Sequence, residues 1–295
     1  MFPAHFEDLD IPVGEHTIRV SQGGEGPPLL LIHGYPQNRF MWHAVAPALA
    51  GAYRVICADL RGYGDSSKPP GGADHAAYAK RAMAADMAAV MSALGHLRFA
   101  VAGHDRGARV AHRLALDHPD RVERVCVMDI APTRHMFRTT DQAFATGYYH
   151  WFFLIQPGGL PERMIGGDPA WWLREKLRRW AAPGAVFDEA AVGEYLRTFS
   201  TPEGIHASCE DYRAAAGIDL QHDDADFGQR RIECPLLVLW GEHGFVHRSY
   251  DVLRVWRDYA SHVAGHTLPS GHFLPEEAPQ RTIESLRAFM TGGAA

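Results

Sequence analysis

Short, largely apolar runs alternate with longer segments of helical periodicity along the first 132 residues of the chain. Such runs are typical of central parallel strands that are covered on both faces. The runs that predict strands are 17–21, 29–32, 54–59, 99–102 and 122–130. The segments that predict helices between them are 40–49, 77–94 and 108–118. This alternation predicts a doubly wound, mostly parallel sheet of the α/β class.

The pattern changes between residues 133 and 226. Strand-like runs disappear there, and helical segments rich in aromatic residues replace them at 148–154, 171–180 and 195–199. Strand patterns return at 235–240 and 262–268, with helical patterns at 252–259 and 277–290. We therefore expect an α/β core made of residues 1–132 and 227–295, and a helical cap at 133–226. The cap is inserted after the strand that carries Asp129.

Composition and charge exclude several classes of function. The chain has 295 residues, of which 46% are apolar and 22% charged, and its net charge of −6 gives no reason to expect a nucleic acid or a membrane as partner. Its four cysteines lie far apart in the sequence, which favours reduced thiols over disulfides or a metal site. The polar N-terminus does not resemble a signal peptide, and no apolar run is long enough for a membrane span. We expect a cytoplasmic protein without a bound metal.

The segment Gly103-His104-Asp105-Arg106-Gly107 joins a predicted buried strand to a predicted helix. Small residues two places before and two places after a central residue allow the sharp turn known as a nucleophile elbow, which exposes the central side chain at the carboxyl edge of the sheet. Here the central residue is Asp105. A carboxylate in this position can attack a saturated carbon that bears a leaving group, such as a halide or an epoxide oxygen, and form an ester.

Hydrolysis of such an ester requires a base that activates water, and a carboxylate that orients the base. His272 follows the last predicted strand in a short loop, where the base is expected from the chain order of this fold. The position of the acid after the strand at 235–240 holds Gly244, so Asp129, at the end of the preceding strand, is the candidate orienting acid. The alternative is that Asp129 only caps its strand, with Glu242 orienting the base.

Two further groups surround the predicted nucleophile. The backbone amides of Tyr35 and Arg106 are expected to form an oxyanion hole for the ester intermediate. The side chains of Arg106 and Arg109 lie on one face at the start of the helix after Asp105. Two guanidinium groups suit a substrate that is itself an anion, because they bind a carboxylate by forked hydrogen bonds. They favour a small 2-substituted carboxylic acid, unless they only pair with Asp105 or with surface acids.

The cap segment carries His150, Trp151 and Tyr212, whose side chains are hydrogen-bond donors able to surround a departing halide. Aromatic residues in a helical cap more often serve packing alone. Taken with the elbow, however, the sequence resembles the fluoroacetate dehalogenases, a haloacetate dehalogenase branch of the α/β-hydrolase fold. The stretches that carry the resemblance are 33–37, 103–109, 116–120, 128–132, 149–151, 211–213, 239–241 and 270–277.

The resemblance implies a role for each of these residues. Asp105 would be the nucleophile, His272 the base and Asp129 its acid partner. Arg106 and Arg109 would bind the substrate carboxylate, and the three cap donors would bind the halide. A 2-haloacid such as fluoroacetate would give a 2-hydroxy acid such as glycolate, without cofactor or metal, in a protein that is a homodimer in this family.

Two alternative functions fit the same pattern in part. An epoxide hydrolase shares the aspartate elbow and the helical cap, but usually presents two cap tyrosines and a tryptophan after the nucleophile, where this chain has Arg106. A non-catalytic ligand receptor of this fold typically lacks one member of the triad, and here all three are present.

Overall fold

The computed structural model describes residues 2–292, and within them eight strands form one sheet with the order β1-β2-β4-β3-β5-β6-β7-β8. The strands are β1 (Glu7–Val13), β2 (His16–Gly23), β3 (Pro28–Ile32), β4 (Arg54–Ala58), β5 (Phe99–His104), β6 (Val122–Met128), β7 (Leu236–Gly241) and β8 (Val263–Leu268). β2 is antiparallel to both β1 and β4, and the other pairs are parallel. The predicted fold class is therefore confirmed.

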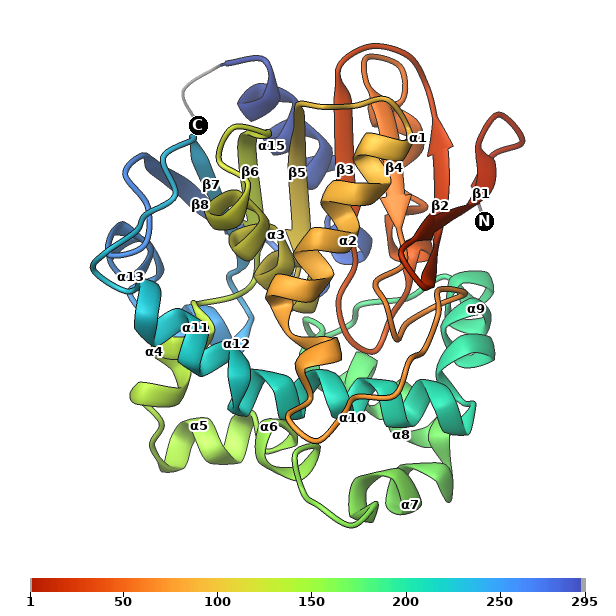
Figure 1. Cartoon of the computed structure of the whole chain (residues 1–295), viewed down its shortest axis with the longest axis vertical. Coiled ribbons are helices and arrows are strands. Elements are labelled where there is room, and N and C mark those ends of the chain that lie inside the picture. Colours follow the sequence, from red (N-terminus) through yellow and green to blue (C-terminus); the bar gives the residue numbers. More distant parts are fainter. Residues whose placement is uncertain (1, 293–295) are drawn as a thin grey trace.

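Helices pack on both faces of this sheet, with α2 and α3 in front of it and α15 behind it in the view of Figure 1. The helices and 3₁₀ turns outside the segment between β6 and β7 are η1 (Arg39–Trp42), α1 (Ala46–Leu49), η2 (Ala76–Tyr78), α2 (Lys80–Ala93), α3 (Arg106–Asp117), α12 (Phe245–Ser249), α13 (Val252–Arg257), α14 (Leu274–Glu277) and α15 (Pro279–Met290). In the part of the chain that the structure describes, no helix combines the length and the hydropathy needed to cross a membrane.

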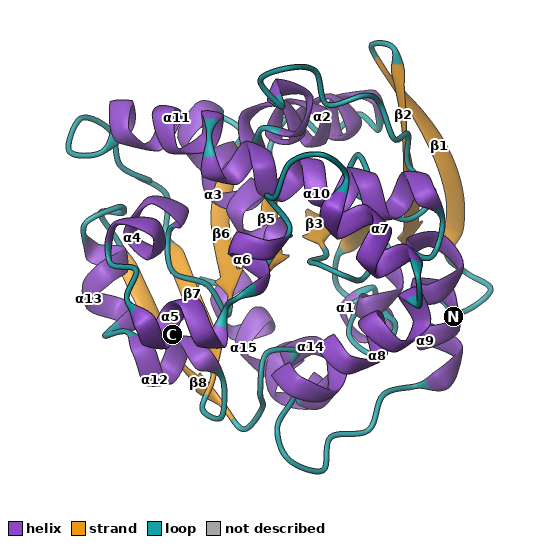
Figure 2. Ribbon diagram, turned by 90° about the horizontal axis from the view of Figure 1, so that it is seen from below, coloured by secondary structure: helices purple, strands orange, loops and turns teal. Residues whose placement is uncertain are grey.

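Helices α4 to α11 follow one another between β6 and β7. They are α4 (Thr133–Arg138), α5 (Gln142–Gly147), α6 (His150–Phe153), α7 (Leu160–Gly166), α8 (Pro169–Trp180), α9 (Glu189–Phe199), α10 (Pro202–Ala216) and α11 (Ile218–Asp226). Several of them lie across the carboxyl edge of the parallel strands, as Figures 1 and 2 show from two directions. The end of β5, where Asp105 lies, therefore faces a layer of helices rather than open solvent.

Two of the differences from the predicted pattern have a clear physical cause. β1 was not predicted, because most of its side chains are exposed or half-exposed and only Ile11 is buried, as expected for an edge strand. The single helix predicted at 40–49 is instead the 3₁₀ turn η1 followed by α1. Pro47 lies in the first turn of α1, where its missing N–H costs nothing, and a helix that continued through it would lose a hydrogen bond.

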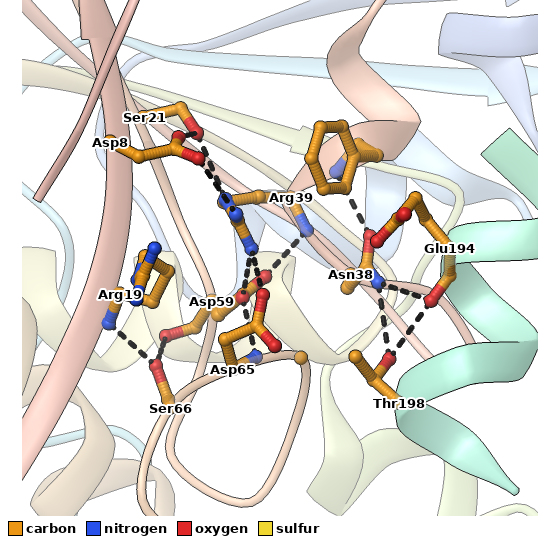
Figure 3. A network of polar contacts seen from close by, with 12 residues as sticks. Asp8, Arg19, Ser21, Asn38, Arg39, Asp59, Asp65, Ser66, Glu194 and Thr198 are labelled. Atoms are coloured by element: carbon orange, nitrogen blue, oxygen red, sulfur yellow. Dashed lines mark hydrogen bonds and ion pairs between the residues drawn. The ribbon is translucent and has the colours of Figure 1, made fainter. Parts of the chain in front are cut away.

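A buried ionic network joins the antiparallel edge of the sheet to the helices that lie across it (Figure 3). Arg39, 2% exposed, donates through its backbone N–H and its Nη1 to the two oxygens of Asp59, at 2.7 Å each. Its Nε donates to Ser21 on β2, and Nη1 also contacts Asp65. Asp65 in turn accepts two hydrogen bonds of 2.8 Å from Arg197 on α9.

Replacing Asp59 with alanine is expected to destabilise the fold strongly. The substitution leaves the buried Arg39 guanidinium without its main counter-ion, and breaking a buried pair in this way costs about 3–5 kcal/mol. Urea unfolding of Asp59→Ala measures the loss. The matched control is Arg98→Ala, which removes a pair with Glu123 whose side chains are 69% and 46% exposed, and is expected to cost less than about 1 kcal/mol. Equal effects of the two substitutions would contradict a stabilising role for the network.

Candidate active site

Asp105 lies at a sharp turn between β5 and α3. Its backbone has φ 48° and ψ −114°, a left-handed conformation that a side chain seldom adopts. The turn depends on the glycines on either side: a Cβ on Gly103 would lie 2.4 Å from the carbonyl oxygen of Gly107, and a Cβ on Gly107 would lie 2.3 Å from that of His33. Both distances are too short for any side chain, so the spacing of small residues seen in the sequence has a steric cause.

The loop after β3 brings a backbone donor to this carboxylate. The Tyr35 amide donates to Asp105 Oδ1 at 3.0 Å. This approach needs Gly34, because a Cβ there would lie 2.5 Å from the Cβ of Asp105. One carboxylate oxygen is thus held by the loop, and the other, Oδ2, faces His272 with its Nε2 at 3.9 Å. The other backbone donor predicted from the sequence belongs to Arg106, the first residue of α3.

His272 is held by Asp129. Its Nδ1 lies 2.6 Å from Asp129 Oδ2, and Oδ1 of the same carboxylate accepts from the Gly241 amide at 3.1 Å. The imidazole Nε2 has no hydrogen-bond partner among the described residues. Glu242, the alternative acid, is 43% exposed and lies 3.4 Å from His243 instead. The geometry therefore connects the imidazole to Asp129 and not to Glu242.

Burial and charge act in opposite directions on these groups. Burial alone would raise the pKa of Asp105, but His272, His104 and the two arginines outweigh it and hold that pKa below its ordinary value. Burial alone would lower the pKa of His272, but its hydrogen bond to Asp129 and the charges of Asp129 and Asp105 raise it above the ordinary value. Asp105 is therefore ionised at neutral pH, beside an imidazole whose basicity is increased.

Both predicted arginines are buried beside Asp105, and their partners differ. Arg106 makes a forked ion pair with Asp211 on α10, with Nε to Oδ2 at 2.8 Å and Nη2 to Oδ1 at 2.7 Å. Arg109 donates to the Ala131 carbonyl and to the Thr133 hydroxyl, and has no acidic partner within the described residues. Neither one is a solvent-exposed charge paired to a surface acid. Arg106 Nη1 and Arg109 Nε are buried and have no hydrogen-bond partner in the described chain.

The three predicted cap donors lie together, and two of them contact these arginines. The Arg106 guanidinium lies 4.2 Å from the centre of the Tyr212 ring, and that of Arg109 lies 4.7 Å from the Trp151 ring. His150 packs edge-to-face with Tyr212, with ring centres 5.6 Å apart. Burial, followed by the charge of Lys176, lowers the pKa of His150 well below its ordinary value, so that this imidazole is neutral. Neutral donors and cations thus border one region above the elbow.

Several residues of this region could not be identified from the sequence. Asp211 binds Arg106 and also accepts from Lys80 and from Tyr63, whose hydroxyl lies 2.7 Å away. Trp180, at the end of α8, packs on His150 with ring centres 4.6 Å apart, and its carbonyl accepts from the His272 amide. An acid or a tryptophan on a helix carries no local signal of such a contact, because the partners come from distant parts of the chain.

The side chains of Tyr35 and Lys176 also make contacts with distant residues that the sequence does not reveal. The Tyr35 hydroxyl accepts from the Trp172 indole at 2.6 Å, so its side chain ties the loop after β3 to α8. Lys176 lies on α8 among Arg174, Arg178 and Arg179. These arginines are exposed, but Lys176 is 1% exposed and lies over the rings of Tyr149 and Trp172. The exposed arginines next to it in the sequence therefore do not indicate that Lys176 is buried.

The arrangement has the parts that covalent catalysis by a carboxylate requires. It has an ionised carboxylate at an elbow, a backbone donor on one of its oxygens, and an imidazole held by a second carboxylate. It also has buried cations beside the nucleophile, with donor nitrogens that the protein itself does not satisfy. The chemistry best matched to these parts is attack on a carbon of a small anion.

Comparison with known proteins places the fold in a family. The sequence model of the protein family described as α/β hydrolase fold matches residues 27–279. A fluoroacetate dehalogenase of Burkholderia sp. is 47% identical over 97% of this chain and 94% of its own, and a soluble epoxide hydrolase of Corynebacterium sp. (strain C12) is 35% identical over 90% and 91%. The crystal structure of a putative α/β hydrolase from Nostoc sp. PCC 7120 superposes with a TM-score of 0.96, at 56% identity over 97% of this chain and 98% of that one. The chain therefore belongs to the α/β-hydrolase family, and a fluoroacetate dehalogenase is its relative over nearly the whole length.

Proposed function

We propose that the protein is a haloacetate dehalogenase, which hydrolyses the carbon–halogen bond of small 2-haloacids such as fluoroacetate. The observation that carries the proposal is the pair of buried arginines beside Asp105, each with one donor nitrogen unpartnered in the described chain. A neutral substrate would leave these donors unsatisfied, which is costly in a buried site, whereas a carboxylate accepts from both. The dehalogenase relative supports the same assignment.

In the first proposed step Asp105 Oδ2 attacks the carbon that bears the halogen. A carbon–oxygen bond forms as the carbon–halogen bond breaks, and the halide leaves with the bonding electrons. Arg106 and Arg109 hold the substrate carboxylate, which would otherwise be repelled by Asp105. His150, Trp151 and Tyr212 donate to the departing halide, and such donors matter most for fluoride because its hydration is strong. Residues 133–226 form the cap that keeps this step away from bulk water.

In the second step water attacks the carbonyl carbon of the Asp105 ester. His272 Nε2 takes the proton of that water, and Asp129 offsets the charge of the resulting imidazolium. Negative charge develops on Oδ1, where the amides of Tyr35 and Arg106 stabilise it. The bond between Cγ and Oδ2 then breaks, and Oδ2 takes the proton of the His272 imidazolium to become the hydroxyl of a 2-hydroxy acid, glycolate in the case of fluoroacetate. Asp105 keeps one oxygen from water and is regenerated as a carboxylate when the remaining water proton passes to solvent.

Epoxide hydrolysis is the second candidate, and a specific contact favours it. Tyr148 is buried beside His150, with ring centres 5.2 Å apart, so a second tyrosine lies near Tyr212. Against it, Arg106 is a buried cation held by Asp211, and a neutral epoxide would gain no ionic interaction from it.

The homodimer and the cytoplasmic location expected from the sequence stay predictions. Light scattering of the purified protein tests the oligomeric state.

Halide release separates the candidate functions. The protein is expected to release halide from chloroacetate and fluoroacetate and to leave a styrene-type epoxide unchanged. Asp105→Asn removes the nucleophile and is expected to lower kcat by at least about 10⁴-fold. His272→Asn keeps the first step but not the second, so mass spectrometry should find a carboxymethyl group on Asp105. Turnover of the epoxide alone would establish the second candidate, and inertness toward every substrate would indicate a receptor.

The pH dependence of kcat is expected to show one acidic limb set by His272. The base must be neutral to accept a proton, and its surroundings raise its pKa above 6.5, so activity falls as the pH drops through a value above 6.5. Asp105 contributes no limb there, because its pKa is below its ordinary value. Asp129→Asn removes the acceptor and the charge, and is expected to lower kcat about 10⁴-fold and to move any residual limb to lower pH. An unmoved limb in that variant would show that another group controls the profile.

Arg109→Leu is expected to lower kcat/KM for chloroacetate about 100-fold, equivalent to roughly 3 kcal/mol of lost binding in the transition state. Arg109→Lys keeps the charge but loses the fork, so it should fall between wild type and the leucine variant. Thermal unfolding of both variants controls for the contacts of Arg109 with Ala131 and Thr133. Steady-state kinetics that match wild type in both variants would remove Arg109 from substrate binding.

A further inference from the structure

A cavity of about 250 Å³ leads from the surface to His272. Its lining comes from four parts of the chain that meet only in the fold: the end of α5 with the residues before α6, the end of α8, the loop after β7 with α12, and the loop after β8 that carries His272. Larger cavities of about 740, 560 and 530 Å³ elsewhere in the described chain include no predicted site residue in their linings. The volume of a cavity therefore does not identify the way into the site. The presence of His272 in the lining of the smaller cavity does.

The inner and outer parts of this cavity differ in chemistry. Tyr148 and Trp180 line it together with His272, and all three are packed against the region above Asp105. Arg179, His243 and Arg248 line it as well, and their side chains are exposed to solvent. An aromatic inner wall and a basic outer rim are thus parts of one passage.

The charge at the rim is positive in excess. Arg248 donates to the carbonyl of His243 at 2.7 Å and forms no ion pair with an acid in the described chain. Arg179 and Arg178 both pair with one carboxylate, that of Glu175, so one of these positive charges is not neutralised. The acid next to His243 is Glu242, which is 43% exposed. Lys176, buried without a carboxylate partner in the described chain, donates to the Tyr149 hydroxyl in the same wall at 2.7 Å. Burial lowers the pKa of Lys176 to about 7, so it adds only part of a positive charge at neutral pH.

We propose that this passage is the entrance for the anionic substrate, and that Arg179 and Arg248 attract it to the mouth. The inference rests on the proposed function, because it takes the substrate to be a small carboxylate. A cleft lined by one sign of charge raises the local concentration and the association rate of an opposite charge, by about 10-fold or more at low salt. The overall charge of −6 would otherwise repel such an anion. The basic rim thus attracts the anion at one place on a molecule whose net charge would repel it.

A cysteine at Thr146 tests the passage directly, because Thr146 is exposed and lines the cavity. Two thiol reagents of similar size, a sulfonatoethyl and a trimethylammonioethyl methanethiosulfonate, place either a negative or a positive group at the mouth. The negative adduct of Thr146→Cys is expected to lower kcat/KM for chloroacetate at least about 10-fold, and the positive adduct to lower it less. The matched control is Ala145→Cys, its exposed neighbour outside the lining, whose adducts should leave kcat/KM within about twofold of wild type.

The outcomes of this experiment are distinct. Failure of unlabelled Thr146→Cys and of wild type to release halide would refute the proposed function itself. Normal activity that neither adduct reduces would refute the entrance and leave the function intact. Equal losses with both reagents would refute the attraction by charge. Loss of ester hydrolysis with an unchanged first burst of halide would also overturn the proposal, because the passage would then admit water and not substrate.

Salt dependence gives a second test of the arginines. In wild type, kcat/KM for chloroacetate is expected to fall as sodium chloride shortens the Debye length to about 8 Å at 0.15 M and below. The double variant Arg179→Gln/Arg248→Gln should lower kcat/KM about 10-fold at low salt and flatten this dependence, with little change in kcat. Arg174→Gln is the control, since Arg174 is on the same helix, is exposed and lies outside the passage. The same salt dependence in the double variant and in wild type would overturn the role of the rim.

Discussion

The charge of one buried carboxylate sets the conditions for the rest of the structure. Asp105 is 8% exposed, and taking an ionised carboxylate out of water is costly unless cations or donors replace the lost hydration. The Tyr35 amide, the imidazole of His272 and the charges of Arg106 and Arg109 provide that replacement. The two arginines are themselves buried, so each must be compensated in turn. Asp211 compensates Arg106 with a forked ion pair, while Arg109 relies on neutral acceptors.

This compensation makes the site depend on the segment between β6 and β7. Asp211 lies on α10, and the rings that cover the guanidinium groups belong to Trp151 on α6 and Tyr212 on α10. An elbow without these helices would leave Arg106 without its counter-ion and Asp105 open to water. The ionic network around Arg39 ties α9 to the loop after β4 through Asp65 and Arg197. The charged site is therefore complete only when these helices are packed against the α/β core.

The sequence predicted those features whose cause is local. The strands β3 to β7 follow from apolar runs, and the elbow follows from Gly103 and Gly107, because their steric role depends only on the chain nearby. What it could not predict depends on distant contacts. In the sequence Asp211 resembles an ordinary surface acid. It is buried because it pairs with Arg106, which lies 105 positions earlier in the chain. Lys176 belongs to a basic helix face, and only the packing of Tyr149 and Trp172 around it reveals that it is buried.

Two positions far apart in the sequence, Asp129 and Gly244, lie close together beside His272. Asp129 directly follows β6, whereas Gly244 follows β7, yet a Cβ on Gly244 would lie 3.2 Å from Asp129 Oδ1. The two places at which an acid could serve His272 therefore converge on one point. Two carboxylates there would repel each other, and one would bind a proton and no longer offset an imidazolium charge. Glycine at 244 is thus the counterpart of aspartate at 129, since it leaves a single carboxylate there, at 2.6 Å from His272 Nδ1.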